Sequence, residues 1–282
     1  MHNTNNWLQL HRDSHSGIET LRAHFKGHAY DPHWHDTYLL GFTEQGVQQF
    51  NCRRKLCTST TGGNFLIEPG EIHDGRAPEN DGFTYRQLYI PEPWLKREMM
   101  SLFPQLPDTL QLSSATTLIE DRRLTSAIAA AFMALQQGEP AIVREACLDQ
   151  LLVCLTAVLK LQQLHDNPHK VSALARQARS FLHANLERDI NLEQLAEQLN
   201  TDRFRITRAF KQAYNIAPHA YLIQLRLSKA RQLLSEGAVP AEVAAKLCFS
   251  DQSHLGRWFR RAYRLTPAQY AKCCTNLPDK QF

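Results

Sequence analysis

The chain has 282 residues, of which 43% are hydrophobic and 21% charged, as is typical of globular proteins, and its length suggests two domains. Thirteen prolines and 12 glycines are too few for a low-complexity or collagen-like chain. The longest apolar run, Leu151 to Leu159, is less than half of the roughly 20 residues that a membrane helix needs, and the N-terminus lacks the pattern of an export signal. We therefore expect a cytoplasmic protein that has no membrane partner.

The net charge of +4 is divided unevenly along the chain. Residues 170–282 carry 18 Lys and Arg against 9 Asp and Glu, which gives +9, whereas residues 1–169 carry 14 against 19, which gives −5. Such an asymmetry is typical of a domain that meets phosphates beside one that does not. The seven cysteines contain no CxxC pair, so we expect reduced thiols rather than a zinc module or a disulfide scaffold.

The N-terminal third has the texture of a β-domain. Residues 1–20, which include Trp7, form an arm that could close over a pocket. From Arg22 to Leu112, short runs such as TYLLGF, GNFLIEPG and FTYRQLYI are separated by Gly, Pro, Asn and Asp. Runs of this kind predict a β-barrel or β-sandwich.

Histidines and glycines in this region resemble the two halves of the cupin barrel pattern, in the segments GHAYDPHWH and GNFLIEPGEIH. His33 and His35 would share one face of a strand, and with His73 they could form a three-imidazole site for zinc or non-haem iron. The glutamate that metal-binding cupins carry shortly after the histidine pair is missing, and the second motif is one residue short. We therefore expect an organic effector in the barrel, with no metal and no cofactor.

The parity of the strand near residue 87 suggests which side chains line that pocket. Tyr85, Gln87 and Tyr89 share one face, and Arg86 lies on the other. These side chains could equally pack in the barrel wall. The candidate effector-binding residues are His33, His35, Tyr38, Glu68, His73, Tyr85, Arg86 and Tyr89.

Two helices are predicted next, over residues 118–137 and 141–164, because apolar residues recur there at helical spacing. Each stripe could pack on the barrel, on the other helix or on a second subunit. We expect a helical dimerisation and linker segment over residues 113–170 that ends in the sequence HDNPHK, whose Asn-Pro discourages a helix. The stripes are Leu124, Ile128 and Phe132 in the first helix and Leu148, Leu151, Leu152, Leu155 and Leu159 in the second.

The C-terminal region contains an internal repeat at an offset of 49 residues. RAFKQAYNIAPHAY begins at Arg208 and RWFRRAYRLTPAQY begins at Arg257. Each copy predicts a short helix (192–199 or 241–247), a tight turn and a second helix that starts at Asp202 or Asp251, which is the pattern of a helix-turn-helix unit.

The second helix of each copy has an apolar face and a polar face. Ile206 and Leu255 would be buried, and so would Phe210, Phe259, Tyr214 and Tyr263, whereas the opposite faces are suited to bases and phosphates, or to solvent alone. The candidate DNA-binding residues are Arg203, Phe204, Thr207, Arg208, Lys211, Gln252, Ser253, His254, Gly256, Arg257 and Arg260.

Residues 171–274 resemble the DNA-binding domain of AraC/XylS-type transcriptional regulators. The resemblance includes both helix-turn-helix units, the bridging text YLIQLRLSKARQLL and the ending FSDQSHLGRWFRRAYRLTPAQY. It implies recognition helices in successive major grooves of double-stranded DNA, an N-terminal sensor for a small-molecule effector, a homodimer, and RNA polymerase as a further candidate partner.

The sequence thus predicts a bacterial α+β multidomain regulator that is not an enzyme. Its parts are a cupin-like sensor (1–112), a helical dimerisation segment (113–170), an all-α double helix-turn-helix domain (171–275) and a tail (276–282). One alternative is a metal-dependent cupin enzyme, such as a dioxygenase or isomerase, fused to a DNA-binding module. The other is a regulator that responds to no effector and has a purely structural barrel.

Overall fold

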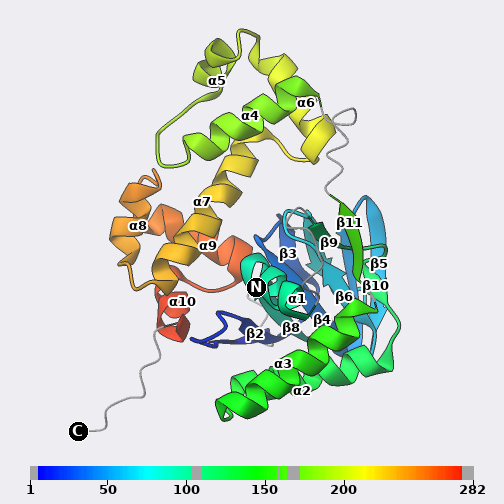
Figure 1. Cartoon of the computed structure of the whole chain (residues 1–282). Coiled ribbons are helices and arrows are strands. Elements are labelled where there is room, and N and C mark those ends of the chain that lie inside the picture. Colours follow the sequence, from blue (N-terminus) through cyan, green and yellow to red (C-terminus); the bar gives the residue numbers. More distant parts are fainter. Residues whose placement is uncertain (1–5, 103–109, 158, 164–171, 275–282) are drawn as a thin grey trace, which may run out of the picture. The chain divides into compact units, whose positions relative to one another are not determined.

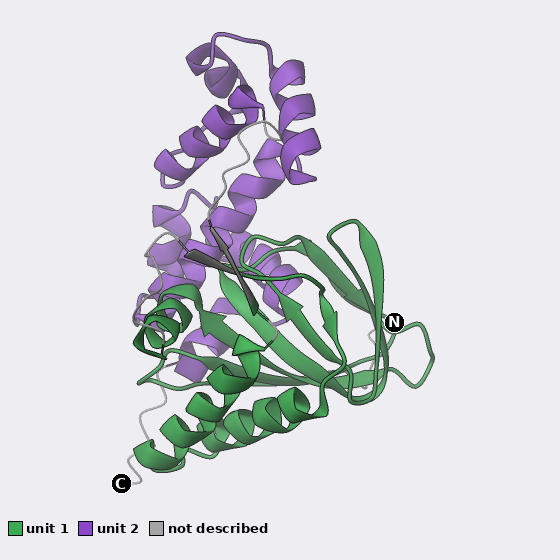
Figure 2. Cartoon of the chain, turned by 45° about the vertical axis from the view of Figure 1, so that its right-hand side comes forward, with its two compact units in different colours: residues 1–164 green, residues 165–282 purple. Residues whose placement is uncertain are grey.

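The computed structural model describes residues 6–102, 110–157, 159–163 and 172–274. It divides into two compact units, residues 1–164 and 165–282 (Figure 2). Unit 1 combines sheets with a layer of helices, and unit 2 is helical over its described residues, which confirms the predicted α+β class. The expected linker 165–170 and tail 276–282 lie outside the described residues. Among the described helices, none is long and apolar enough to cross a membrane.

Unit 1 is built around one long strand, β4, which pairs with β6 and β8 through its first half and with β5 and β7 through its second. Around it, β1, β2 and β8 lie side by side, as do β6 and β10, and β3 pairs with β7 (Figure 1). The strands are β1 Trp7–Arg12, β2 Glu19–Phe25, β3 His28–His33, β4 Thr37–Cys52, β5 Lys55–Thr60, β6 Asn64–Ile67, β7 His73–Arg76, β8 Phe83–Pro91, β9 Leu110–Ser114, β10 Leu118–Ile119 and β11 Leu159–Gln163.

Alternation along these strands creates two separate cores. Tyr85 and Tyr89 of β8 belong to a cluster between the strands, whereas Leu88 and Ile90 belong to a second cluster beneath the helices. Because successive strand side chains point to opposite faces, the barrel interior and the helical layer share the same strands. The predicted parity of β8 is confirmed.

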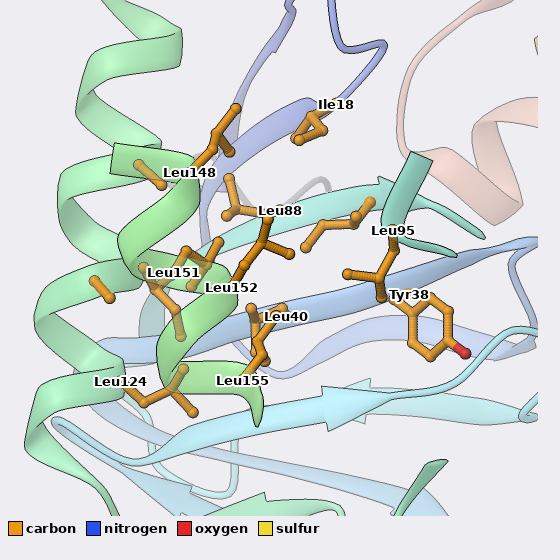
Figure 3. Close-up of a cluster of buried hydrophobic side chains, with 14 of the residues drawn as sticks. Ile18, Tyr38, Leu40, Leu88, Leu95, Leu124, Leu148, Leu151, Leu152 and Leu155 are labelled. Carbon is orange, nitrogen blue, oxygen red and sulfur yellow. The ribbon is translucent and has the colours of Figure 1, made fainter. Parts of the chain in front are cut away.

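The helical layer consists of α1 (Glu92–Leu102), α2 (Arg122–Gln136) and α3 (Ala141–Thr156). Leu151 and Leu155 of α3 are almost completely buried, and they lie opposite Leu40 and Leu88 of the sheet (Figure 3). Leu124 of α2 joins the same cluster. The sequence left open whether the two apolar stripes pack on the barrel, on each other or on a second subunit. In the structure they pack on the barrel and on each other.

Both predicted helix boundaries in this segment need correction. The second helix ends at Thr156, and Leu159–Gln163 forms strand β11, which pairs antiparallel with β9. The first helix begins at Arg122, capped by the side chain of Asp121, because Leu118–Ile119 pairs with β6. Short apolar runs do not distinguish strand from helix, and the pairing partners lie far away in sequence.

The N-terminal arm forms an edge strand over Trp7–Arg12, which pairs with β2. The Trp7 ring stacks against His24 at 6.2 Å between centroids, and the Arg22 guanidinium lies over it. This stretch of the arm therefore lies along the sheet, and Trp7 is not among the residues that line the pocket described below.

Unit 2 contains the two predicted helix-turn-helix copies. Asp202 and Asp251 cap the second helix of each copy, and Pro218 and Pro267 open the helices that follow, as the sequence predicts. The helices are α4 Ala173–Ala184, α5 Leu192–Gln198, α6 Arg203–Tyr214, α7 Pro218–Ser235, α8 Pro240–Lys246, α9 Gln252–Tyr263 and α10 Pro267–Cys274.

Each copy closes around the same aromatic pair. Phe210 packs against Tyr221, with ring centroids 5.3 Å apart, and Phe259 packs against Tyr270 at 5.6 Å. Both phenylalanines are fully buried, as expected. An arginine donates to each tyrosine hydroxyl: Arg179 Nε lies 2.9 Å from Tyr221 and Arg231 Nε 3.2 Å from Tyr270.

The buried Arg226 on α7 joins the two copies. Its guanidinium donates to the carbonyl oxygens of Leu186 and Arg188, at 3.0 and 2.8 Å, in the loop after α4. It also reaches the carbonyl of Cys248, at 3.4 Å, in the turn before α9. Burial lowers the pKa of Arg226, but three carbonyl acceptors solvate its charge.

We expect Arg226→Met to lower the free energy of unfolding of unit 2 by about 2–3 kcal/mol, because three backbone carbonyls lose a charged hydrogen-bond donor. Amide hydrogen exchange in α7 and α9 of the full chain measures the loss. Arg205→Met, at an exposed position on α6, is the control and should stay within about 0.5 kcal/mol. Equal exchange rates in the two variants would contradict this role.

Candidate functional site

A pocket of about 40 Å³ opens between the strands of unit 1. Five of the eight predicted effector-binding residues line it: His33, His35, His73, Tyr85 and Tyr89. Several residues outside the candidate set also line it, from β3, β4, β6, β7 and β8. They are Tyr30, Leu39, Gln48, Phe50, Phe65, Ile67, Asp74, Gly75 and Phe83, together with Gln87, which the parity of β8 places on the same face as Tyr85 and Tyr89.

The three histidines meet at one side of this pocket. His33 and His73 are paired in register across β3 and β7, and His35 lies just beyond the end of β3. Ring centroids are 4.4 Å apart for His33 and His73, 4.8 Å for His33 and His35, and 5.3 Å for His35 and His73. All three side chains are buried.

Backbone carbonyls fix the orientation of two of these rings. Nδ1 of His33 lies 2.7 Å from the oxygen of Asp31, and Nδ1 of His73 lies 2.9 Å from that of Glu71. Since a carbonyl only accepts, each Nδ1 carries the hydrogen. Burial lowers the pKa of His73 to about 4, against the opposing effects of the Glu71 carbonyl and Asp74, so this ring is neutral near pH 7.

The remaining walls combine aromatic and aliphatic side chains with the amides of Gln48 and Gln87 and the carboxylate of Asp74. The hydroxyls of Tyr30 and Tyr85 lie 3.0 Å apart, and Gln48 donates to the Thr43 hydroxyl. The Asp74 carboxylate accepts from the backbone and side-chain nitrogens of Asn51. The described lining residues include no Lys or Arg.

Three predicted effector-binding residues lie away from the pocket. Tyr38 belongs to the cluster beneath the helices, because it stands on the other face of β4. Arg86 pairs with Glu44 at 3.0 Å, on the other face of β8. Glu68 forms an ion pair with Arg53 and accepts from the backbone nitrogen of Ser114 at 2.7 Å, so it binds β9 instead.

A second, larger cavity of about 270 Å³ lies beside α1 and α3 of unit 1. Its buried acid, Asp13, pairs with Arg144 at 2.8 Å. Burial alone would raise the pKa of Asp13, but hydrogen bonds from Ser16 and the charge of Arg144 lower it. The acid at the base of this cavity is therefore ionised and already paired.

In unit 2, the second helix of the first copy, α6, presents a basic and aromatic surface. Arg203, Phe204, Arg208 and Lys211 are exposed, and Phe204 is 65% exposed despite its size. Thr207 on the same helix is half-buried. The Arg203 guanidinium lies 5.0 Å from the centroid of the Phe204 ring and pairs with Glu193 at 2.7 Å.

The second helix of the other copy, α9, presents an equivalent surface. Gln252, Ser253, Arg257 and Arg260 are exposed, and Gly256 is half-buried. These positions match Arg203, Phe204, Arg208, Lys211 and Thr207 at the offset of 49 residues.

His254 differs from the other candidates on α9, because its ring takes part in the fold. Trp258 Nε1 donates to His254 Nε2 at 2.9 Å. The backbone nitrogen of Ser250 donates to the other ring nitrogen, Nδ1, at 3.2 Å, and the Ser250 hydroxyl lies 3.3 Å from the same atom. The ring thereby fastens the turn to the helix.

Two family models match the chain. Residues 15–153 match the AraC-like ligand binding domain, which covers β2 to most of α3 in unit 1. Residues 195–272 match a helix-turn-helix domain, which covers both copies in unit 2.

Bacterial transcriptional regulators are among the similar proteins. The uncharacterized HTH-type transcriptional regulator YbfI of Bacillus subtilis is 26% identical over 261 residues, 90% of this chain and 91% of that protein. The HTH-type transcriptional activator RhaS of Escherichia coli is 30% identical over 134 residues, 47% of this chain and 48% of RhaS.

Solved structures of ToxT from Vibrio cholerae share the fold. A ToxT variant solved without ligand has a TM-score of 0.59 at 13% identity, covering 94% of this chain and all of that chain. Wild-type ToxT solved with an unsaturated fatty acid has a TM-score of 0.56 at 12% identity, covering 97% of each chain.

Proposed function

The chain belongs to the AraC/XylS-type family of transcription regulators, with a ligand-binding domain ahead of a helix-turn-helix DNA-binding domain. We propose which surfaces of these two domains bind DNA and which bind the effector. Helices α6 and α9 read DNA, and the pocket of unit 1 binds the effector. The observation that carries the proposal is the matched pair of exposed basic helix faces, each backed by the same buried aromatic pair.

Helix α7 sets the spacing of the two reading helices. It has 18 residues, about 27 Å in length, and it packs against helices of both copies. Successive major grooves on one face of DNA are about 34 Å apart, so a bridge of this length suits two helices that enter neighbouring grooves. The DNA site is therefore composed of two short elements about one helical turn apart.

The two elements differ in sequence because the two reading surfaces differ. Arg208 and Arg257 occupy equivalent positions, where an arginine can bind guanine through two hydrogen bonds. Phe204 offers an apolar contact to a thymine methyl group, whereas Ser253, its equivalent, offers a hydroxyl. Gln252 suits adenine. The His254 ring is hydrogen-bonded to Trp258 within the fold, so we do not include it among the residues that contact DNA.

The effector of this chain is small and needs no cationic side chain. ToxT has been solved with an unsaturated fatty acid. The pocket here has a volume of about 40 Å³, far below the 300–1,000 Å³ of a typical drug-sized site, and its described lining holds no Lys or Arg to pair with a carboxylate. A long-chain fatty acid is thus a poor match for it.

Effector binding acts through a population shift. Only a difference in affinity between two arrangements of the chain can move the equilibrium between them. On this proposal the protein is a regulator without a reaction of its own, as its relatives are regulators. RNA polymerase is a further partner where the output is activation.

Dimerisation uses the outer face of α3 rather than its leucine stripe. Leu151 and Leu155 are buried within the unit, whereas Ile142 and Val153 are 75% and 55% exposed. These two residues and Ala146 lie on one side of the helix, at spacings of four and seven residues. Exposed apolar residues in such a row suit a contact with a second copy.

Selection of the full chain against random duplex DNA, at a stated salt concentration, tests the reading surfaces. We expect two short elements about one turn apart. Arg208→Ala and Arg257→Ala should each relax one element and cost about 1–3 kcal/mol of discrimination there, and Phe204→Ala should remove a thymine preference in the first. Enrichment of no sequence, or relaxation of both elements by each variant, would contradict the assignment.

Tyr89→Phe and Gln87→Leu test the effector pocket. Each variant removes a polar group from the pocket lining, and the new side chain has fewer non-hydrogen atoms than the one it replaces. We expect the change in DNA affinity caused by the effector to be weakened, with DNA affinity in its absence unchanged. Arg97→Ala, beside the second cavity, is the control. A response lost in the control and kept in the other two would move the site to that cavity.

Ile142→Lys and Val153→Lys together test the dimer face. We expect the sedimenting mass to fall from two chains to one, because charge at the centre of an apolar contact is costly. Leu151→Lys would instead unfold unit 1, because its side chain is fully buried. A dimer that survives the double substitution would place the contact elsewhere.

A further inference from the structure

Three imidazoles converge in the pocket without the acidic partner expected of a metal-binding cupin. One ring nitrogen from each of His33, His35 and His73 lies within 4.8 Å of those of the other two. Within the described part of the chain, no other set of three His, Cys, Asp or Glu side chains comes together in this way. We propose that this triad binds a divalent first-row transition metal ion of the zinc type. The inference rests on the proposed role of the pocket as the ligand site of unit 1.

The backbone prepares two of the rings to act as ligands. His33 and His73 each donate Nδ1–H to the carbonyl two residues earlier, at 2.7 and 2.9 Å. The lone pair of each ring is thereby assigned to Nε2. Histidines that bind metal ions ordinarily donate their other ring N–H to a carbonyl or carboxylate, which fixes both the tautomer and the ring plane.

The strand framework places the ligands at a suitable separation. His33 and His73 face each other in register across β3 and β7, and the carbonyl of His35 accepts from the backbone nitrogen of Gly70 at 2.8 Å. Zinc–nitrogen bonds of about 2.0–2.1 Å place tetrahedral ligand nitrogens about 3.4 Å apart. The rings therefore have to draw together by roughly an ångström, within the reach of small side-chain rotations.

The donor set selects the class of ion. Imidazole nitrogens favour zinc and its transition-metal neighbours, whereas calcium and magnesium require oxygen ligands. The nearest lining carboxylate, Asp74, is held by two hydrogen bonds from Asn51 and is not part of the triad. The protein would supply three neutral ligands and leave a coordination position open.

The open position would allow a pocket without Lys or Arg to take an anion. The ion would be the cation at that site, and a volume of about 40 Å³ leaves room for roughly three water-sized positions beside it. An oxygen donor that carries negative charge, either a small anion or the acidic group of a small effector, fits there. The aromatic walls formed by Tyr30, Tyr85 and Tyr89 would enclose the rest of it.

Metal titration of the full chain tests the inference. After treatment with a chelator, protein is titrated with Zn²⁺ and with Co²⁺, whose visible spectrum reports coordination, and the bound metal is counted by elemental analysis. We expect one ion per chain. His33→Gln and His73→Gln should each weaken binding by at least about 100-fold, the upper end of what an outer-shell change costs. His28→Gln, on the same strand with its side chain 60% exposed, should leave binding unchanged.

X-ray absorption on the zinc-loaded wild-type chain gives a second measurement that does not depend on the folding of variants. We expect nitrogen ligands at about 2.0–2.1 Å and no sulfur at about 2.3 Å. Sulfur ligation would assign the ion to some of the seven cysteines and overturn the inference. Failure to bind one ion per chain, or affinity unchanged in the His33 and His73 variants, would overturn it as well.

DNA selection with the same preparations separates the two proposals. If the chain selects its DNA elements and responds to an effector but binds no metal, the proposed metal site is contradicted and the proposed function stands. A chain that binds one ion at the triad but selects no DNA sequence, with or without metal, keeps the metal site and contradicts the proposed reading of DNA by α6 and α9.

Discussion

The twofold alternation of side chains along β4 and β8 is the constraint on which unit 1 depends. It directs Tyr85 and Tyr89 into the pocket and Leu88 and Ile90 toward α2 and α3. A shift of one residue in the register of β8 would exchange these faces, placing leucine in the pocket and tyrosine beneath the helices. The ligand site and the helical layer are therefore two sides of the same strands, and neither can be repacked alone.

Unit 2 depends on a different device, which separates what is repeated from what varies. In each copy, a buried phenylalanine packs against a tyrosine, and the hydroxyl of that tyrosine accepts a hydrogen bond from an arginine. These contacts lie on the inner side of α6 and α9, so the outer side is released from packing. That is why Phe204 and Ser253 can differ at equivalent positions although the two copies share a fold.

Local features of this chain were readable from its sequence, and contacts between distant segments were not. The caps Asp202 and Asp251, the helix starts at proline and the parity of β8 all depend on residues within a few positions, and the structure confirms them. The pairing of β9 with β11 joins segments about 50 residues apart, and neither strand has a strong pattern. Arg226 reads as one more basic residue until its three carbonyl partners are known.

The pocket residues were predictable to the same extent. The histidines were found because their spacing is regular, and five of eight candidates line the cavity. Tyr38 and Arg86 lie on the strand faces that point away from the pocket. The alternation of side chains along a strand separates two faces, but it does not tell which of them faces the barrel interior. Glu68 was misplaced because its partner, Arg53, comes from the turn between β4 and β5, which no local pattern links to it.

The short segment from Glu68 to His73 contacts both the pocket and the last strands of unit 1. Its inner side supplies His73 and binds His35 through Gly70. Its outer side supplies Glu68 and Glu71, which both pair with Arg53. Glu68 also binds β9, whose partner β11 is the last described strand before unit 2.

A ligand that draws the three histidines together would therefore act on the segment that also carries Glu68, the residue that is hydrogen-bonded to β9. Coupling between the pocket and the β9–β11 ribbon then requires one short segment with two arrangements rather than a long chain of contacts. Its size is limited by the difference in ligand affinity between those arrangements, and typical couplings of about 1–3 kcal/mol change affinity by about 5- to 150-fold. A loop tied to both sides by hydrogen bonds and ion pairs can carry an energy of that order.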